Sequence, residues 1–105
     1  MLFMNEYEIE DAVRQHADDP VLGPASLTLR NLMDWTNRNS DGWAYWPKPC
    51  RAAKNLQALI QKHNPVSLRW GCYEADCAEE YKLALRAIRA FRTRQGADFE
   101  IVEPS

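Results

Sequence analysis

Four stretches of helical periodicity, each bounded by turn-forming residues, are the feature that most constrains the fold of this chain. Apolar residues that recur at intervals of three and four line one face of a helix, and such a face has to be buried against another element. Of the 105 residues, 46% are apolar, which suffices for one hydrophobic core. We therefore expect residues 1–105 to form a single, mostly α-helical domain, a small bundle of about four helices.

The first helix carries the clearest start signal. Asn5 is a favoured N-cap residue, and Glu8 stands three positions later, where it completes a capping box. Residues 18–20 contain two aspartates and a proline, and we expect them to end this helix. Its apolar stripe consists of Ile9, Ala12, Val13, His16 and Ala17.

The other three helices are bounded by similar signals. The second opens at residues 23–24, where proline is tolerated in the first turn, and the turn-forming cluster 37–42 breaks it. We expect the third helix over about 49–63 and the fourth over about 73–95, with Gly96 as the residue that closes it. The predicted inner face of the fourth helix consists of Cys77, Tyr81, Ala84, Leu85, Ile88 and Phe91.

Two short segments have the pattern of strands. Residues 66–70 alternate between apolar and polar side chains, as a half-buried strand does, and the apolar end of the chain is a second candidate. Residues 66–70 and 98–102 would then pair as a minimal two-stranded sheet. The alternative is that 66–70 is an extended connector, because Gly71 follows at once.

The composition indicates a protein of the cytoplasm that does not contact membranes. No apolar run approaches the roughly 20 residues that cross a bilayer, and the first residues lack the basic and apolar regions of a signal peptide. The three cysteines, an odd number, fit a reducing compartment better than a disulfide framework. They are Cys50, Cys72 and Cys77.

Metal and cofactor sites are not indicated. Cys72 and Cys77 are five residues apart and neither forms a C-x2-C pair, so the zinc pattern is missing. Residues 37–42 copy the start of a calcium-binding EF-hand loop. The twelfth position of that loop would be Lys48, where calcium needs a glutamate. We expect neither a metal nor a cofactor.

Catalytic motifs are also missing from the sequence. The two histidines, His16 and His63, fall on predicted inward stripes near helix ends, where a histidine is usually a buried or boundary residue. The chain has no nucleophile elbow, phosphate-binding glycine loop or dinucleotide-binding turn. We therefore expect a protein that is not an enzyme.

The start of the third helix combines aromatic and basic residues. Between residues 42 and 73 there are five basic residues and no acidic one. Cations are disfavoured at a helix N-terminus, so the helix dipole does not explain the ones found here. Aromatic and arginine side chains anchor many protein interfaces, although large rings also fold back into a core. The predicted partner-binding residues are Trp43, Tyr45, Trp46, Lys48, Arg51 and Lys54.

A resemblance to a known group falls on the same region. Residues 35–49, from Trp35 through the run Trp43, Ala44, Tyr45, Trp46 to Pro49, resemble a stretch of small uncharacterised proteins of actinobacterial bacteriophages. This resemblance implies a phage accessory protein that acts in the bacterial cytoplasm. It implies no activity and no site residue.

Three functions follow from these features. The first is binding of a protein partner, with host proteins among the candidates, through residues 43–54. The second is binding of nucleic acid by the same surface, supported by Arg86, Arg89 and Arg92 of the fourth helix. The macrodipole offers a purely structural reason for cations in that half of the helix. The third is an oligomerising module with the aromatic loop packed into a symmetric partner.

Overall fold

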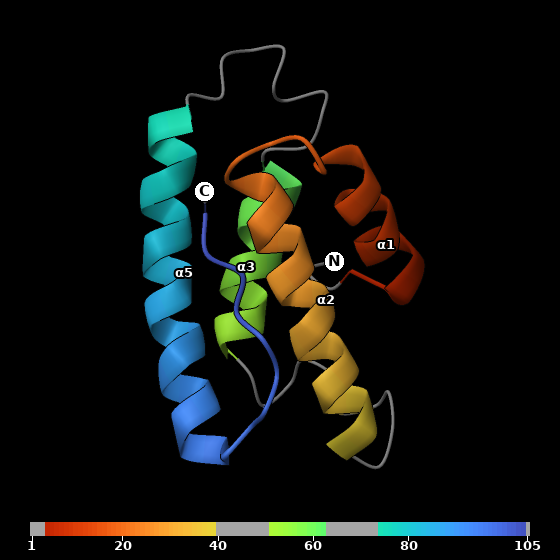
Figure 1. The fold of residues 1–105 in the computed structure, drawn as a ribbon, viewed down its shortest axis with the longest axis vertical. Helices are drawn as coiled ribbons and strands as arrows, with labels where there is room; N and C mark the ends of the chain where they lie inside the picture. Colours follow the sequence, from red (N-terminus) through yellow and green to blue (C-terminus); the bar gives the residue numbers. More distant parts are fainter. Residues whose placement is uncertain (1–3, 40–50, 63–73, 105) are drawn as a thin grey trace.

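The computed structural model describes residues 4–39, 51–62 and 74–104. These residues form α1 (Glu6–Gln15), α2 (Leu22–Asn39), α3 (Arg51–Lys62) and α5 (Glu74–Gln95). Successive helices run in alternating directions, with α1 packed on α2, α2 on α3 and α3 on α5 (Figure 1). The predicted helical bundle is thus confirmed. No helix in these ranges is both long and apolar enough to span a bilayer.

The core lies where the four helices meet. Of the stripe predicted for the first helix, Ile9, Ala12 and His16 are buried, Val13 is half-buried and Ala17 is exposed. The stripe predicted for the fourth helix is buried in full, including the large side chain of Tyr81 and the thiol of Cys77. Trp35 of α2 packs against this core, with its ring edge-on to Phe91 at a centroid distance of 5.9 Å and tilted against Phe99 at 6.2 Å. These contacts join α2, α5 and the segment that follows α5.

The turn between α1 and α2 contains the C-cap of α1 and the residue that caps α2. The capping box at the start of α1 is present as predicted, but the helix ends at Gln15, with His16 as its C-cap, before the predicted stop at 18–20. Asp19 belongs to the next helix instead. Its carboxylate accepts the N–H groups of Val21 at 2.8 Å and Leu22 at 2.7 Å, and α2 begins at Leu22, just before the predicted opening at residues 23–24.

The end of α2 falls inside the turn-forming cluster 37–42 that was expected to break the helix. The helix continues into this cluster and ends at Asn39. The side chains of Arg38 and Asn39 donate to the backbone carbonyls of Asp34 and Trp35, at 3.3 and 2.8 Å. Each of these side chains therefore bonds back to the carbonyl four residues earlier on the same helix.

Gly96 closes α5 as predicted. It has a φ of +59°, a conformation that glycine adopts without steric cost, and Ala97 N–H donates to the carbonyl of Arg92 at 3.0 Å. The chain then reverses and runs back along the bundle between α5 and α2 (Figure 1). We call residues 97–104 the C-terminal segment.

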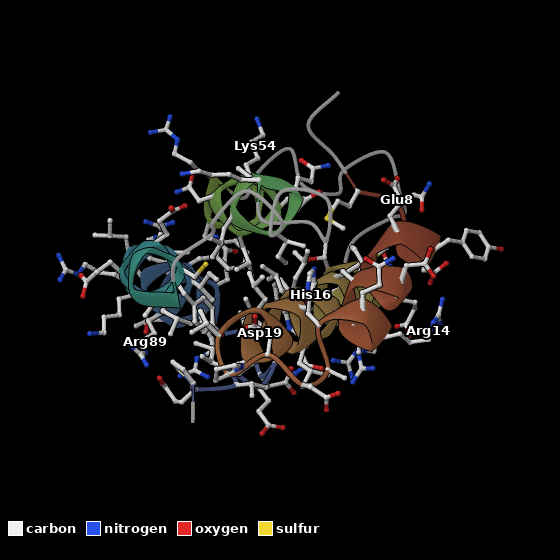
Figure 2. All side chains as sticks on the ribbon, turned by 90° about the horizontal axis from the view of Figure 1, so that it is seen from above. Glu8, Arg14, His16, Asp19, Lys54 and Arg89 are labelled. Atoms are coloured by element: carbon white, nitrogen blue, oxygen red, sulfur yellow. The ribbon has the colours of Figure 1, made fainter. Side chains whose placement is uncertain are left out.

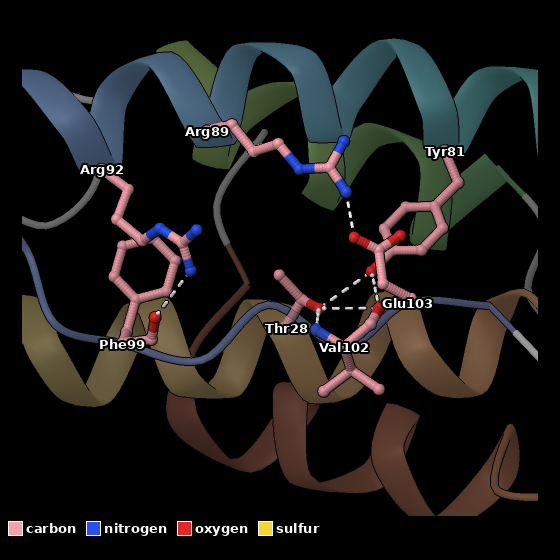
Figure 3. Close-up of polar contacts among 7 residues, drawn as sticks. All are labelled: Thr28, Tyr81, Arg89, Arg92, Phe99, Val102 and Glu103. Carbon is pink, nitrogen blue, oxygen red and sulfur yellow. Dashed lines mark hydrogen bonds and ion pairs between the residues drawn. The ribbon is translucent and has the colours of Figure 1, made fainter.

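The C-terminal segment does not form the predicted strand, and residues 66–70 lie outside the described ranges. Side chains of the helices take the hydrogen bonds that a second strand would provide. Tyr81 donates to the carbonyl of Val102 at 2.6 Å, and Val102 N–H donates to the hydroxyl of Thr28 at 2.9 Å (Figure 3). Asn31 donates to the carbonyl of Glu100 at 3.1 Å. The C-terminal segment therefore lies along α2 and α5 and is held by hydrogen bonds to side chains of both helices.

Candidate functional site

The basic residues at the start of α3 lie beside the C-terminal half of α5. Lys62, the last residue of α3, pairs with Glu80 near the start of α5, with the two charged atoms 3.0 Å apart. The end of one helix therefore meets the beginning of the other, and the helices are antiparallel (Figure 1). At about 1.5 Å per residue, Arg51 lies level with the last turns of α5.

The arginines of α5 divide between two flanks of that helix. At about 100° per residue, Arg94 projects within about 40° of Glu80, on the flank that faces α3, whereas Arg89 projects about 180° from Glu80. Arg86 points away from the buried stripe, between these two directions. Arg86, Arg89 and Arg94 are all exposed.

The flank opposite α3 faces the C-terminal segment. The guanidinium of Arg89 pairs with the carboxylate of Glu103, and Arg92 donates to the carbonyl of Phe99 at 3.3 Å (Figure 3). Two of the three arginines predicted to support nucleic-acid binding thus hold the protein's own C-terminal segment. Sequence spacing did not predict these contacts. They depend on the reversal of the chain after Gly96, which brings residues 97–104 back along α5.

We define the basic face as Arg51 and Lys54 of α3 together with Arg86 and Arg94 of α5. Arg51, Arg86 and Arg94 are exposed and have no acidic partner among the described residues, while Lys54 is half-buried. Lys54 projects from α3 away from the centre of the bundle (Figure 2).

The two helix segments that form the basic face carry positive charges only. Described α3 contains three basic and no acidic residues, and α5 has five basic and no acidic residues from Tyr81 to Gln95. These two segments are far apart in sequence and adjacent in space. The summed field of such a patch attracts anionic surfaces even when the net charge of the chain is −2.

The rest of the predicted site lies outside the described residues. This holds for Trp43, Tyr45, Trp46 and Lys48. Trp46 precedes Arg51 by five residues, so a fully extended chain separates their Cα atoms by at most about 18 Å.

His16, the C-cap of α1, is a buried titratable residue. It is only 3% exposed, as its place on the inward stripe predicted. Burial lowers its pKa, and the nearby Asp19 carboxylate opposes that effect. The residue borders a depression of about 470 Å³ between α1 and α3, together with Glu8 and Asp11.

Neither carboxylate in this depression is available as a partner for the imidazole. Glu8 accepts the backbone N–H of Asn5 at 3.2 Å, and Asp11 pairs with Arg14. Within residues 4–39, 51–62 and 74–104, no group of three histidine, cysteine, aspartate or glutamate side chains is placed to hold a metal ion.

Comparisons with protein-family models, with curated proteins and with solved structures give no significant match. The basic face is therefore interpreted from its own geometry and charge.

Proposed function

We propose that this protein is a non-enzymatic binding protein, a phage-type accessory protein of the bacterial cytoplasm, that recognises an acidic surface of a protein partner through the basic face. The supporting observation is the antiparallel packing of α3 and α5, which places Arg51 and Lys54 beside Arg86 and Arg94 without an intervening acidic residue on either segment. Arginine is suited to this role because its planar guanidinium binds carboxylates through two hydrogen bonds.

The aromatic residues that precede α3 would extend the same contact. Trp43, Tyr45 and Trp46 are joined to Arg51 by a short stretch of chain, so a partner bound at the start of α3 is within their reach. Interfaces of this kind depend on a few aromatic and arginine anchors, surrounded by contacts of little energetic weight. Residues 43–54 and the α5 arginines would thus form one binding surface.

A pair of matched variants tests this proposal. Arg51→Glu reverses a charge on the basic face, and Arg14→Glu makes the same change on exposed α1, across the bundle. In pull-downs from a bacterial lysate at low salt, wild type and Arg14→Glu are expected to recover the same protein, and Arg51→Glu is expected to lose it. Equal recovery by both variants would show that the basic face is not the binding surface.

Nucleic acid is the second candidate partner. It is favoured by the run of five basic residues without an acid in the C-terminal half of α5. A polyanion releases counterions on binding, so the affinity for a labelled oligonucleotide would fall steeply between about 50 and 200 mM salt. Fluorescence anisotropy over this range separates the two partners, because a flat salt response or no binding at low salt excludes nucleic acid.

A further inference from the structure

Helix α1, on the side of the bundle away from α5, carries charge of the opposite sign. The exposed surface of α1 has four acidic residues and one basic residue, Arg14. We define the acidic face as Glu6, Glu8, Glu10 and Asp11. Helix α1 packs on α2 while α5 packs on α3, so the acidic face and the α5 part of the basic face lie on opposite sides of the bundle (Figure 1).

Each of these faces also presents one large apolar side chain to solvent. Tyr7 is 81% exposed and Leu83 is 63% exposed, and they are the exposed large hydrophobic residues of the described ranges. Tyr7 lies three and four residues before Glu10 and Asp11, which places it on their side of α1. Leu83 lies three residues before Arg86, on the flank of α5 that faces α3.

The two faces are therefore complementary in charge and in apolar character. An arginine above the face of a tyrosine ring gains a cation–π attraction in addition to its ion pairs with carboxylates. Tyr7 has acidic neighbours that would draw Arg86 or Arg94 toward its ring. A low net charge, −2 for the whole chain, adds little repulsion between two copies.

We propose that the acidic face of one copy docks on the basic face of a second copy. This inference rests on the proposed function, because it names an acidic protein surface that the basic face recognises. The contact joins two different surfaces of the same molecule, so it is head-to-tail and, in an open chain, leaves one face of each type unoccupied at the ends. The product is a head-to-tail chain or ring of copies and not an isologous dimer.

The affinity of this contact should be modest and sensitive to salt. An exposed ion pair contributes a factor of at most about five to an association constant, and screening reduces that factor at high ionic strength. We expect the average mass in sedimentation equilibrium to rise with protein concentration at low salt. The rise should be lost in high salt.

Charge reversal on one face at a time provides the decisive test. The first variant combines Glu6→Lys with Asp11→Lys on α1, and the second combines Arg51→Glu with Arg86→Glu. Neither pair touches the Glu8 capping box or a buried side chain. On the residues that define each face, either double change brings the net charge of that face to zero, so each variant alone lacks one of the two complementary faces and should remain monomeric. An equimolar mixture restores opposite faces and should associate.

The outcomes separate this inference from the proposed function. A wild type that stays monomeric at every concentration, or reversed variants that associate as well as wild type, would overturn the self-docking contact. A partner captured by wild type and lost on Arg51→Glu would still support the basic face in that case. If circular dichroism shows that the α1 double variant is unfolded, Tyr7→Ser takes its place, and unchanged association of that variant overturns the proposal.

Discussion

Removal of the Tyr81 hydroxyl tests how the C-terminal segment is held. The side chain is fully buried, and its hydroxyl donates to the carbonyl of Val102 and lies 2.8 Å from the hydroxyl of Thr28. In Tyr81→Phe the carbonyl of Val102 retains only a long contact of 3.5 Å with Thr28. A buried hydrogen bond lost in this way lowers the free energy of unfolding by about 1–2 kcal/mol.

The same hydroxyl should make the stability depend on pH in alkaline solution. Burial raises the pKa of Tyr81 to about 12, from 10.0 in the unfolded chain. The unfolded state then loses its proton first as the pH rises, so stability that is present below pH 10 is lost between about pH 10 and 12. A pKa difference of two units corresponds to a loss of at most about 3 kcal/mol in the free energy of unfolding. Tyr81→Phe has no hydroxyl at this position and should not show that loss.

Urea denaturation followed by circular dichroism, at neutral pH and at several alkaline values, measures both effects. Tyr7→Phe is the matched control, because its ring is exposed and its hydroxyl should affect neither quantity. The difference between wild type and Tyr81→Phe should be largest at neutral pH and shrink above pH 10. A difference that is zero at neutral pH, or constant through the alkaline range, would refute the buried hydroxyl network.

Three further predictions concern the turn between α1 and α2. Because burial lowers the pKa of His16 below 6.5, wild type should lose stability as the pH falls below that value, and denaturation of His16→Gln should show a weaker loss. Asp19→Ala removes the cap of α2 and should cost about 1 kcal/mol in urea denaturation, whereas an unchanged midpoint would exclude the cap. Gly23→Ala places a Cβ 2.8 Å from the carbonyl oxygen of His16, and thermal melting should show a loss of about 1–3 kcal/mol, with no loss contradicting the close packing.

Local signals in the sequence were sufficient for most of the helical architecture. The capping box of Asn5 and Glu8 was predictable because both partners lie within one turn, and Gly96 because a left-handed C-terminal residue favours glycine. The sequence pattern places Asp19 at the end of α1, but a residue of this type followed by proline is also the signal of an N-cap before a new helix. Asp19 is therefore compatible with the end of α1 and with the start of α2, and its hydrogen bonds show that it caps α2.

Features that depend on distant residues were not predictable in this way. The apolar pattern of residues 98–102 indicated a strand, but the hydrogen bonds of this segment go to Thr28, Asn31 and Tyr81 on two helices. Likewise, sequence spacing groups Arg89 with Arg86, which lies three residues before it on the exposed side of α5. Only the position of the C-terminal segment shows that Arg89 is paired with Glu103.

The proposed function requires that the basic face is the surface that binds an acidic partner. The most direct test is an NMR titration of isotopically labelled protein with a short glutamate-rich peptide at low salt. We predict that the largest shift changes occur at Arg51, Lys54, Arg86 and Arg94, and that they disappear as salt is added. Changes confined to α1, or no changes at all, would contradict the assignment of the binding surface to α3 and α5.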